Sequence, residues 1–329
     1  MTTVHPRSLD EAASFEGEFR AGGTDVEARR RSGLVEAVTI DLRRLGELRG
    51  MESGPDGVRI GAMTRITALA VFVADTHPAL ALTAGSLANP HTRSAATVGG
   101  NLLQQTRCRY FRTGDVDCFK TGGDGCPARA GIHSFGTVFD TSPCVAPHPS
   151  SLGMALLLYD AVATVHPGGS RSVADLYDPA EPRHEHTLGR GEILTAVELP
   201  SGMEGERAGY HRATARMAAE WPLVEAVCRL HVTGDVIDMA AVAVGGVAPI
   251  PMRLPAVEEA LVRQEPGAGV LEAAARRARH GTTAHPDTAY KIGLMVGSVL
   301  EALEQAVAGS AVSEIPVHER PLNGSRFSR

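Results

Sequence analysis

The sequence predicts an α+β protein made of more than one packed part, and three observations support this. The chain has 329 residues, enough for two or three units with a sizeable hydrophobic core. Short strand-like runs alternate with helical runs along most of its length. The composition, 43% hydrophobic and 21% charged, is that of an ordinary globular protein.

Charge and apolar pattern exclude several classes of protein. The formal net charge is −6, which gives no electrostatic reason to expect a nucleic acid partner. No apolar stretch reaches the roughly 18 residues that a membrane span needs. The N-terminal segment lacks the basic and apolar regions of a signal peptide. We therefore expect a protein that folds in the cytoplasm, and a partner with its own signal could carry it to the periplasm.

The first 60 residues are expected to form short strands with one helix between them. Strands near 19–21 and 37–40 flank a helix near 25–31. A turn signal, Asp56-Gly57, precedes a further strand.

Helices dominate the block that follows. Thr64 or Thr67 could cap a helix at 67–74, and Pro78 begins the next helix. After Pro149 we expect a helix at 151–161, strands at 161–166 and 193–200, a linker at 201–209, strands at 223–232 and 239–247, and helices near 255–264, 268–280 and 286–306. The polar end, 308–329, is expected to be an extended tail.

Two glycine-rich strings, AGGTDV at 21–26 and TVGGN at 97–101, could both bind phosphate. Glycine has no Cβ, so backbone N–H groups can surround an anion at close range. A hydroxyl of Thr24 or Thr97 would add a donor, and the helix after Asp25 would direct its positive end toward the anion. Neither string is a Rossmann fingerprint or a P-loop. On the residues alone, a simple turn remains the commoner interpretation of each.

Four of the five cysteines lie within 37 positions. They are Cys108, Cys118, Cys126 and Cys144, in a segment, 107–147, with little periodicity. A stretch this long needs something to order it, and a metal site would do so where disulfides are not expected. The spacing lacks the close pairs of zinc sites and the pattern of bacterial ferredoxins, so zinc, iron–sulfur and unrelated thiols all stay open. Cys228 stands apart in an apolar strand and is interpreted as a core thiol.

Further motifs accompany the two glycine strings: GEIL at 191–194, AVGGVAPIPMRLPAVEEAL at 243–261, and Tyr290-Lys291-Ile292. With these motifs the sequence resembles, over nearly its whole length, the flavoprotein subunits of the xanthine dehydrogenase family. The resemblance implies a two-subdomain FAD-binding fold of the vanillyl-alcohol oxidase type, with subdomains at 1–55 and 56–201. A C-terminal α+β domain of the CO dehydrogenase flavoprotein type would follow at 203–306.

The resemblance also implies which residues hold FAD. In the family, the two glycine loops bind the diphosphate, Leu194 lies near the isoalloxazine ring, and Arg212 stands where a lysine is usual. The implied FAD-binding residues are Phe19, Ala21, Gly22, Gly23, Thr24, Asp25, Val26, Ala96, Thr97, Gly99, Gly100, Asn101, Ser151, Leu194 and Arg212. Trp221 lies in a segment that the family places alongside the flavin, and a plain core role is an equal alternative.

The sequence motifs around the cysteines resemble those of the flavin subunit of periplasmic-type bacterial aldehyde oxidoreductases. These motifs are TVGGNLLQQTRCRYFR, DCFK, GCPA and SPCVAPHPS. That likeness implies a 4Fe–4S cluster on Cys108, Cys118, Cys126 and Cys144. Two positions depart from the family pattern: Ser151 replaces an aspartate that helps to hold the flavin, and Ser94 replaces an asparagine.

The implied activity is electron transfer rather than catalysis on an organic substrate. A partner with a molybdenum cofactor would oxidise an aldehyde or N-heterocycle, and a 2Fe–2S subunit would pass the electrons to FAD and on to an external acceptor. The alternatives are a stand-alone flavin reductase or oxidase of the same fold, the flavin subunit of an aryl-CoA reductase, and a non-enzymatic zinc scaffold. No catalytic residue is assigned, and the histidines, His184 and His186 included, are interpreted as mostly solvated.

Overall fold

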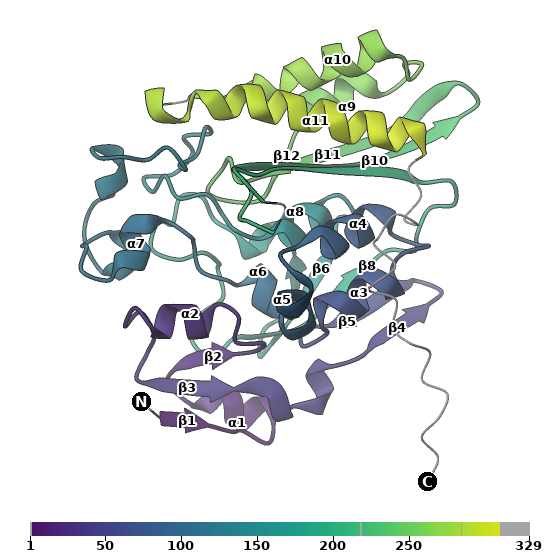
Figure 1. The fold of residues 1–329 in the computed structure, drawn as a ribbon. Coiled ribbons are helices and arrows are strands. Elements are labelled where there is room, and N and C mark those ends of the chain that lie inside the picture. The colour runs from purple at the N-terminus through teal and green to yellow at the C-terminus, as the bar shows by residue number, and fades with distance from the viewer. Residues whose placement is uncertain (1, 218, 284, 310–329) are drawn as a thin grey trace.

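A computed structural model describes residues 2–309 except 218 and 284, and Figure 1 shows its fold. The N-terminal part is a three-stranded parallel sheet in the order β1-β3-β2. Its elements are β1 (Thr2–Val4), α1 (Leu9–Ser14), β2 (Glu18–Arg20), α2 (Val26–Arg30) and β3 (Val38–Asp41). Ile40, Leu45 and Leu48 form the centre of its core. The expectation of one helix was incomplete, because α1 has six residues and buries only Ala12, too short for a helical period to be visible.

The middle part is built on a five-stranded antiparallel sheet in the order β4-β5-β8-β6-β7. The strands are β4 (Met51–Gly54), β5 (Gly57–Gly61), β6 (Val162–His166), β7 (Gly169–Ser172) and β8 (Ile193–Leu199). Helices α3 (Ile66–Phe72), α4 (Pro78–Ser86), α5 (Pro90–Ala95), α6 (Val98–Leu102) and α8 (Ser151–Leu157) accompany them. Every residue of α8 is buried, as its continuous apolar run predicts.

The C-terminal part is a four-stranded antiparallel sheet in the order β12-β11-β10-β9. Its elements are β9 (Arg207–Ala213), β10 (Val224–Thr233), β11 (Val236–Gly245), β12 (Met252–Arg253), α9 (Pro255–Leu261), α10 (Ala268–Arg276) and α11 (Tyr290–Ala308). Helix α11 packs on one face of this sheet, and α4 and α8 pack on the other (Figure 1). Because both faces are covered, Val227 points into one core and Cys228 into the other, which explains why consecutive residues of β10 are apolar here.

The cysteine-bearing segment 107–147 contains one short helix, α7 (Arg109–Thr113), and 3-10 turns at Phe119–Thr121 and Pro127–Arg129. Its last part docks on the C-terminal sheet. The Val138 and Phe139 amides donate to the Val247 carbonyl at 2.8 and 3.2 Å. Both side chains are buried in the core beneath α9, α10 and α11. The segment therefore bridges the middle and C-terminal parts.

Several local predictions can be compared with these elements. The predicted threonine caps are wrong, because α3 begins after Arg65 without a side-chain cap and the Thr64 hydroxyl donates to the Gly50 carbonyl at 3.1 Å. The interpretation of Cys228 as a core thiol is confirmed: it is 0% exposed, and burial raises its pKa to about 12. The predicted linker at 201–209 already enters β9 at Arg207.

Two other expectations stay as they were. The boundaries of the units at 1–55, 56–201 and 203–306 remain predictions. Nearly all of the predicted tail, 308–329, lies outside the described residues. Within the described part of the chain, no helix is both long and apolar enough to cross a bilayer.

Candidate functional site

The two glycine strings touch each other. The first runs from the end of β2 to the start of α2, and the second forms the start of α6. A Cβ on Gly22 would lie 2.1 Å from the Ala95 carbonyl oxygen, so only glycine allows this approach. Gly23 has a φ of +81°, a conformation that other residues rarely adopt.

The first loop presents a row of backbone donors. Among the described residues, no atom accepts a hydrogen bond from the backbone N–H of Gly22, Gly23, Thr24 or Asp25. Backbone N–H groups without partners are uncommon in folded proteins unless water or a ligand accepts from them. Successive free N–H groups in a turn form a concavity suited to an anion.

The second loop is held by its own hydrogen bonds. The Thr97 hydroxyl oxygen caps α6 by accepting from the Gly100 amide at 3.1 Å, and its O–H can still donate to a ligand, as predicted from the sequence. The Asn101 Oδ1 accepts from the Ser150 hydroxyl at 2.8 Å and from the Leu152 amide at 3.2 Å. Asn101 therefore fixes the glycine loop to the start of α8.

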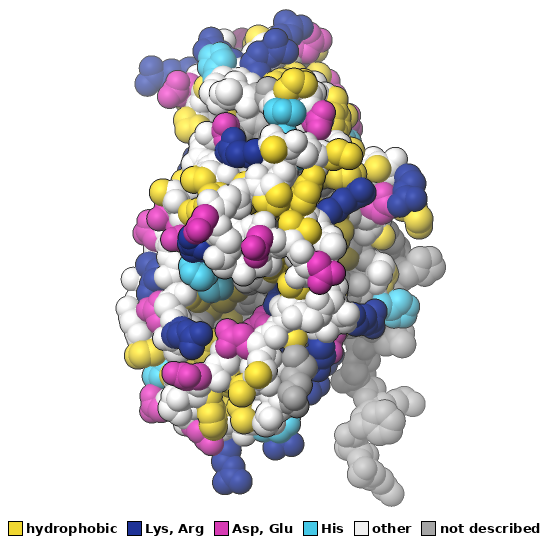
Figure 2. All heavy atoms as spheres, turned by 90° about the vertical axis from the view of Figure 1, so that its left-hand side faces the viewer, with side chains coloured by type: hydrophobic (Ala, Val, Ile, Leu, Met, Phe, Trp, Pro, Cys, Tyr) yellow, Lys and Arg dark blue, Asp and Glu magenta, His cyan; other side chains and the backbone are white. Residues whose placement is uncertain are grey.

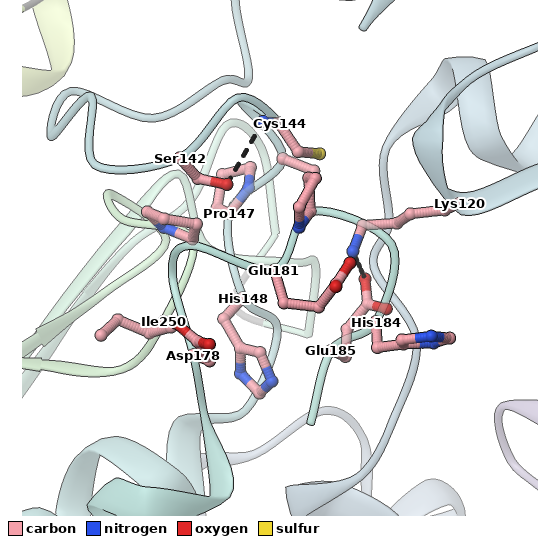
Figure 3. Close-up of a pocket in the computed structure, with 13 residues that line it drawn as sticks. Lys120, Ser142, Cys144, Pro147, His148, Asp178, Glu181, His184, Glu185 and Ile250 are labelled. Carbon is pink, nitrogen blue, oxygen red and sulfur yellow. Dashed lines mark hydrogen bonds and ion pairs between the residues drawn. The ribbon is translucent and has the colours of Figure 1, made fainter. Parts of the chain in front are cut away.

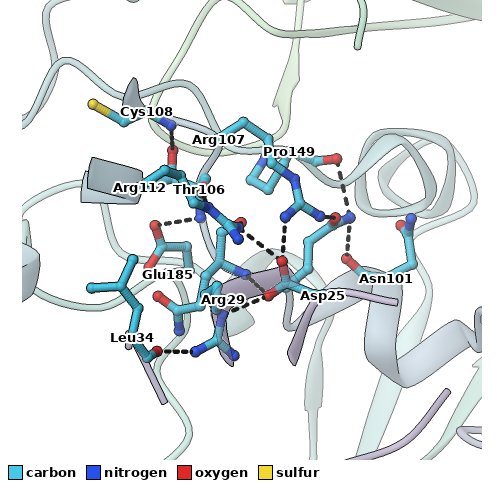
Figure 4. Close-up of polar contacts among 12 residues, drawn as sticks. Asp25, Arg29, Leu34, Asn101, Thr106, Arg107, Cys108, Arg112, Pro149 and Glu185 are labelled. Atoms are coloured by element: carbon cyan, nitrogen blue, oxygen red, sulfur yellow. Dashed lines mark hydrogen bonds and ion pairs between the residues drawn. The ribbon is translucent and has the colours of Figure 1, made fainter. Parts of the chain in front are cut away.

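Asp25 is the centre of a buried charge network, drawn in Figure 4. Its carboxylate pairs with Arg29 at 3.0 Å, with Arg112 at 2.8 Å and with Arg107. It also accepts from the Gln105 amide at 3.2 Å. Burial alone would raise the pKa of Asp25, but Arg107 and Arg112 outweigh it and lower the pKa to about 2. This carboxylate therefore ties the first glycine loop to the beginning of the cysteine segment.

The shifted pKa of Asp25 predicts acid sensitivity. The carboxylate stabilises the fold above its ordinary pKa of 3.8, and this contribution disappears as the pH falls toward 2. We expect Asp25→Asn to lower the free energy of unfolding by about 2 kcal/mol at pH 5. At pH 3, the difference in the free energy of unfolding between the variant and the wild type should be smaller by about 1 kcal/mol. Urea unfolding followed by circular dichroism measures both values, and a gap that does not change with pH would contradict the ion network.

Ser151 meets a carboxylate that sequence reasoning missed. Its hydroxyl contacts both carboxylate oxygens of Glu225 at 2.8 Å, and the Tyr210 hydroxyl donates to the same carboxylate at 2.7 Å. Burial raises the pKa of Glu225, and the Arg212 guanidinium opposes this shift. Arg212 lies opposite Glu225 across β9 and β10 and donates to the Ser86 and Glu220 carbonyls. The sequence gives one sign of this site: Glu225 is the single charged residue in the apolar first half of the strand predicted at 223–232.

The other predicted flavin residues belong mostly to the strands and helices that carry the two loops. Phe19 is on β2 opposite Ile40, and Val26 is buried at the start of α2. Leu194 is 3% exposed on β8, in the core of the middle part. Its neighbour Thr195 accepts from the Ala62 amide at 2.8 Å, and the Ala62 carbonyl accepts from the Gly99 amide at 2.8 Å. The structure therefore brings Ala21–Val26, Ala96–Asn101 and Ser151 together, with Leu194 linked through the sheet.

A cavity of about 420 Å³ opens between the cysteine segment and the C-terminal sheet. Its walls include Tyr110, Phe135, Trp221 and Glu225. Trp221 is 50% exposed, and the Arg107 guanidinium lies 4.2 Å from the centre of its ring, so the alternative core role is wrong. Arg107, which lines this cavity, also pairs with Asp25 of the first glycine loop.

The four grouped cysteines, which are separated by intervals of 8 to 18 positions, line one small, mainly apolar cavity. Among the described residues, no three of their sulfur atoms all lie within 4.8 Å of one another. A tetrahedral zinc site, with Zn–S near 2.3 Å, would need sulfurs about 3.8 Å apart. The thiols are therefore not arranged as an assembled tetrahedral zinc site, although the Cys126 and Cys144 side chains interact directly.

A buried ion pair between Lys120 and Glu185 lies in the pocket that Cys144 also lines (Figure 3). The Lys120 ammonium pairs with Glu185 at 2.9 Å, with side chains 8% and 3% exposed. Burial lowers the pKa of His148 to about 3 and that of His186 to about 4. His186 is half-buried and so only partly solvated, whereas His184 is exposed, as interpreted from the sequence. Lys120 lines the cysteine cavity as well, so it supplies a buried positive charge next to the thiols.

The face that carries the cysteine segment shows acidic and basic side chains interspersed, with no area dominated by one sign (Figure 2). Apolar side chains lie among them. The exposed apolar residues of this region are Ile132, Phe135, Met217 and Trp221.

Comparison with known protein families gives two matches that cover most of the chain. Residues 1–202 match the family described as FAD binding domain in molybdopterin dehydrogenase. Residues 209–308 match the CO dehydrogenase flavoprotein C-terminal domain. The chain is similar to the aldehyde oxidoreductase FAD-binding subunit PaoB of Escherichia coli (strain K12), with 36% identity over 258 residues, 74% of this chain and 79% of that protein.

The fold is similar to solved structures of two further enzymes. The reconstituted CO dehydrogenase from Oligotropha carboxidovorans superposes with a TM-score of 0.72 at 21% identity, covering 94% of this chain and 97% of that chain. Quinoline 2-oxidoreductase from Pseudomonas putida 86 gives 0.71 at 18% identity, with 94% and 97% covered. Together with the family matches, these likenesses confirm the predicted fold class.

Proposed function

Because this chain belongs to the FAD-binding subunits of the xanthine dehydrogenase family of molybdenum hydroxylases, we propose that it relays electrons within a heteromeric enzyme. A large molybdopterin-binding partner would oxidise an aldehyde or an N-heterocycle. A 2Fe–2S partner would pass the electrons to FAD on this chain, and an external acceptor would remove them. The similarity to an aldehyde oxidoreductase subunit favours an aldehyde as the substrate.

One observation supports the flavin site above the others: the unpartnered N–H groups of Gly22–Asp25 lie in a loop that touches the second glycine loop. We propose that these groups hold the FAD diphosphate, which is an anion that needs several donors. Gly22 allows the first loop to pack against the backbone of Ala95 and Ala96, and Gly100 has no side chain that would enter the contact between the two loops. The Asp25–arginine network would not contact the isoalloxazine ring but would keep the first loop in place.

Around the isoalloxazine ring we propose Ser151, Arg212 and Leu194, by analogy with the family. The carboxylate that the family usually carries at position 151 is supplied here by Glu225, since Ser151 contacts that side chain directly. FAD, when bound, accepts electrons singly and releases them singly or in pairs, so the chain has only to bind and orient it. The cavity beside Glu225 and Trp221 offers the acceptor a route to this site.

We further propose that Cys108, Cys118, Cys126 and Cys144 hold a 4Fe–4S cluster. One feature supports it: the four thiols line one cavity, next to the buried ammonium of Lys120. Its role would be to order the segment 107–147, because the flavin can receive electrons directly from the partner's 2Fe–2S centre.

Reconstitution tests the proposed function. Purified alone, the chain should contain flavin but should show no aldehyde-dependent reduction of a dye, because it lacks a molybdenum site. Mixed with the molybdenum and 2Fe–2S subunits of its proposed complex, it should restore that reduction. Turnover of an aldehyde or heterocycle by the isolated chain would contradict the subunit assignment, and a chain without bound flavin would contradict the cofactor.

A further inference from the structure

Two imidazoles and a carboxylate converge where the cysteine segment meets the start of α11. His133 comes from the cysteine segment, and His285 and Asp287 come from the short 3-10 turn that precedes α11. One ligand atom from each side chain lies within 4.8 Å of the other two. None of the three contributes to the glycine loops or to the cavity of the four cysteines.

The orientation of His133 suits metal binding. Its side chain is buried, and its Nδ1 lies 2.5 Å from the Ala128 carbonyl oxygen. A carbonyl can only accept, so Nδ1 carries the proton and Nε2 keeps its lone pair. Metal-binding histidines usually donate their second ring N–H to a carbonyl or carboxylate in this way.

The other two donors are exposed and lie close to this ring. The His133 and His285 ring centres are 3.9 Å apart, with the planes inclined by 52°. The His133 amide donates to Asp287 Oδ2 at 3.4 Å, which holds that carboxylate beside the imidazoles. The Asp287 amide donates to His285 Nδ1 at 3.3 Å, a long bond that a stronger ligand interaction can replace.

We propose that His133, His285 and Asp287 bind one divalent transition metal ion, of the class that includes Zn²⁺. Two nitrogen donors and one carboxylate suit zinc and its neighbours, whereas magnesium and calcium prefer oxygen ligands. Three protein ligands leave a position for water, since two of the three side chains are exposed.

The ion would tie the cysteine segment to α11. At the same junction, the Lys291 ammonium donates to the Gly136 carbonyl at 2.9 Å and to the Gly246 carbonyl at 2.5 Å. This lysine is 1% exposed and joins the same two parts of the chain. A metal bridge between His133 and the turn at His285–Asp287 adds a second tie and closes a long loop, which stabilises the docked segment.

Calorimetric titration of the full, flavin-loaded chain with ZnCl₂ tests the site. His285→Ala and Asp287→Asn remove exposed ligands without disturbing the core, and His280→Ala is the matched control, an exposed histidine at the end of the turn after α10. The wild type and the control should bind one ion with equal affinity. Both ligand variants should bind at least about tenfold more weakly, because even losing a second-shell partner costs 10–100-fold. All four proteins keep the same cysteines, so binding by thiols does not distinguish them.

Limited proteolysis gives the second readout. Zinc should slow trypsin cleavage within 107–147 in the wild type and the control but not in the two ligand variants. Equal zinc affinity in all four proteins would mean an adventitious ion only and would overturn the site. Cleavage that zinc does not slow in the wild type would overturn the tie between the cysteine segment and α11.

Discussion

Replacing Gly100 by leucine is expected to give a folded chain without flavin. A Cβ at this position points into the contact between the two glycine loops, 2.9 Å from the Thr97 hydroxyl oxygen and 3.7 Å from the Ala21 methyl group. A longer side chain would extend into the space that we assign to the diphosphate. Overpacking of a tight contact costs about 1–3 kcal/mol. Together with the lost phosphate contacts, this should weaken FAD binding by at least about tenfold.

The matched control is Gly297→Leu on α11, where nothing lies within 4 Å of an added Cβ. This variant should keep full flavin occupancy. The flavin-to-protein absorbance ratio after gel filtration measures occupancy, and far-ultraviolet circular dichroism shows whether each variant has folded. Full occupancy in Gly100→Leu would mean that the second loop does not bound the flavin site.

The glycine loops were predictable because their signal is local. A run such as Ala21–Val26 specifies a turn by its own backbone requirements, and the positive φ of Gly23 shows why glycine stands there. The strands around Cys228 were visible for a related reason, since burial on both faces produces an apolar run. Resemblance to a family then placed both features in one fold.

The side chains that complete the site were not predictable in this way. Asp25 pairs with Arg107 and Arg112, which lie more than 80 positions away in sequence, and Ser151 at the start of α8 meets Glu225 of β10. Each pair forms only when separate units pack together. A sequence pattern can show that Glu225 is an unusual residue for an apolar strand, but it carries no information about its partner.

The cysteine segment illustrates the same limit. Its spacing was compatible with zinc, with iron–sulfur or with unrelated thiols, because the distance between sulfurs depends on how an aperiodic segment folds. The structure places the four thiols around one cavity and docks Val138 and Phe139 in the core under α11. Part of the order of this segment thus comes from ordinary packing, and the proposed cluster would have to order only the remainder.

Because packing and the proposed cluster would order different parts of this segment, replacing Cys126 by serine should affect only one of them. The wild-type chain should contain iron near four atoms per chain, and the variant should lose nearly all of it, since a serine hydroxyl is a poor ligand for iron–sulfur clusters. The part of the segment before Gly136 should then become sensitive to protease. The docked part around Val138 should stay protected, because its contacts with the C-terminal sheet do not involve the cysteines.

Cys228→Ser is the matched control, because this thiol lies in β10 and bonds to the Ala302 carbonyl at 3.2 Å rather than lining the cysteine cavity. It should keep its iron even if burying a hydroxyl there costs some stability. Metal analysis by mass spectrometry, with visible spectra of both variants, measures the outcome. Stoichiometric zinc in the wild type, or iron that survives in Cys126→Ser, would contradict the cluster. Flavin should remain in Cys228→Ser, because this thiol is buried in β10 and takes no part in the contacts of the two glycine loops.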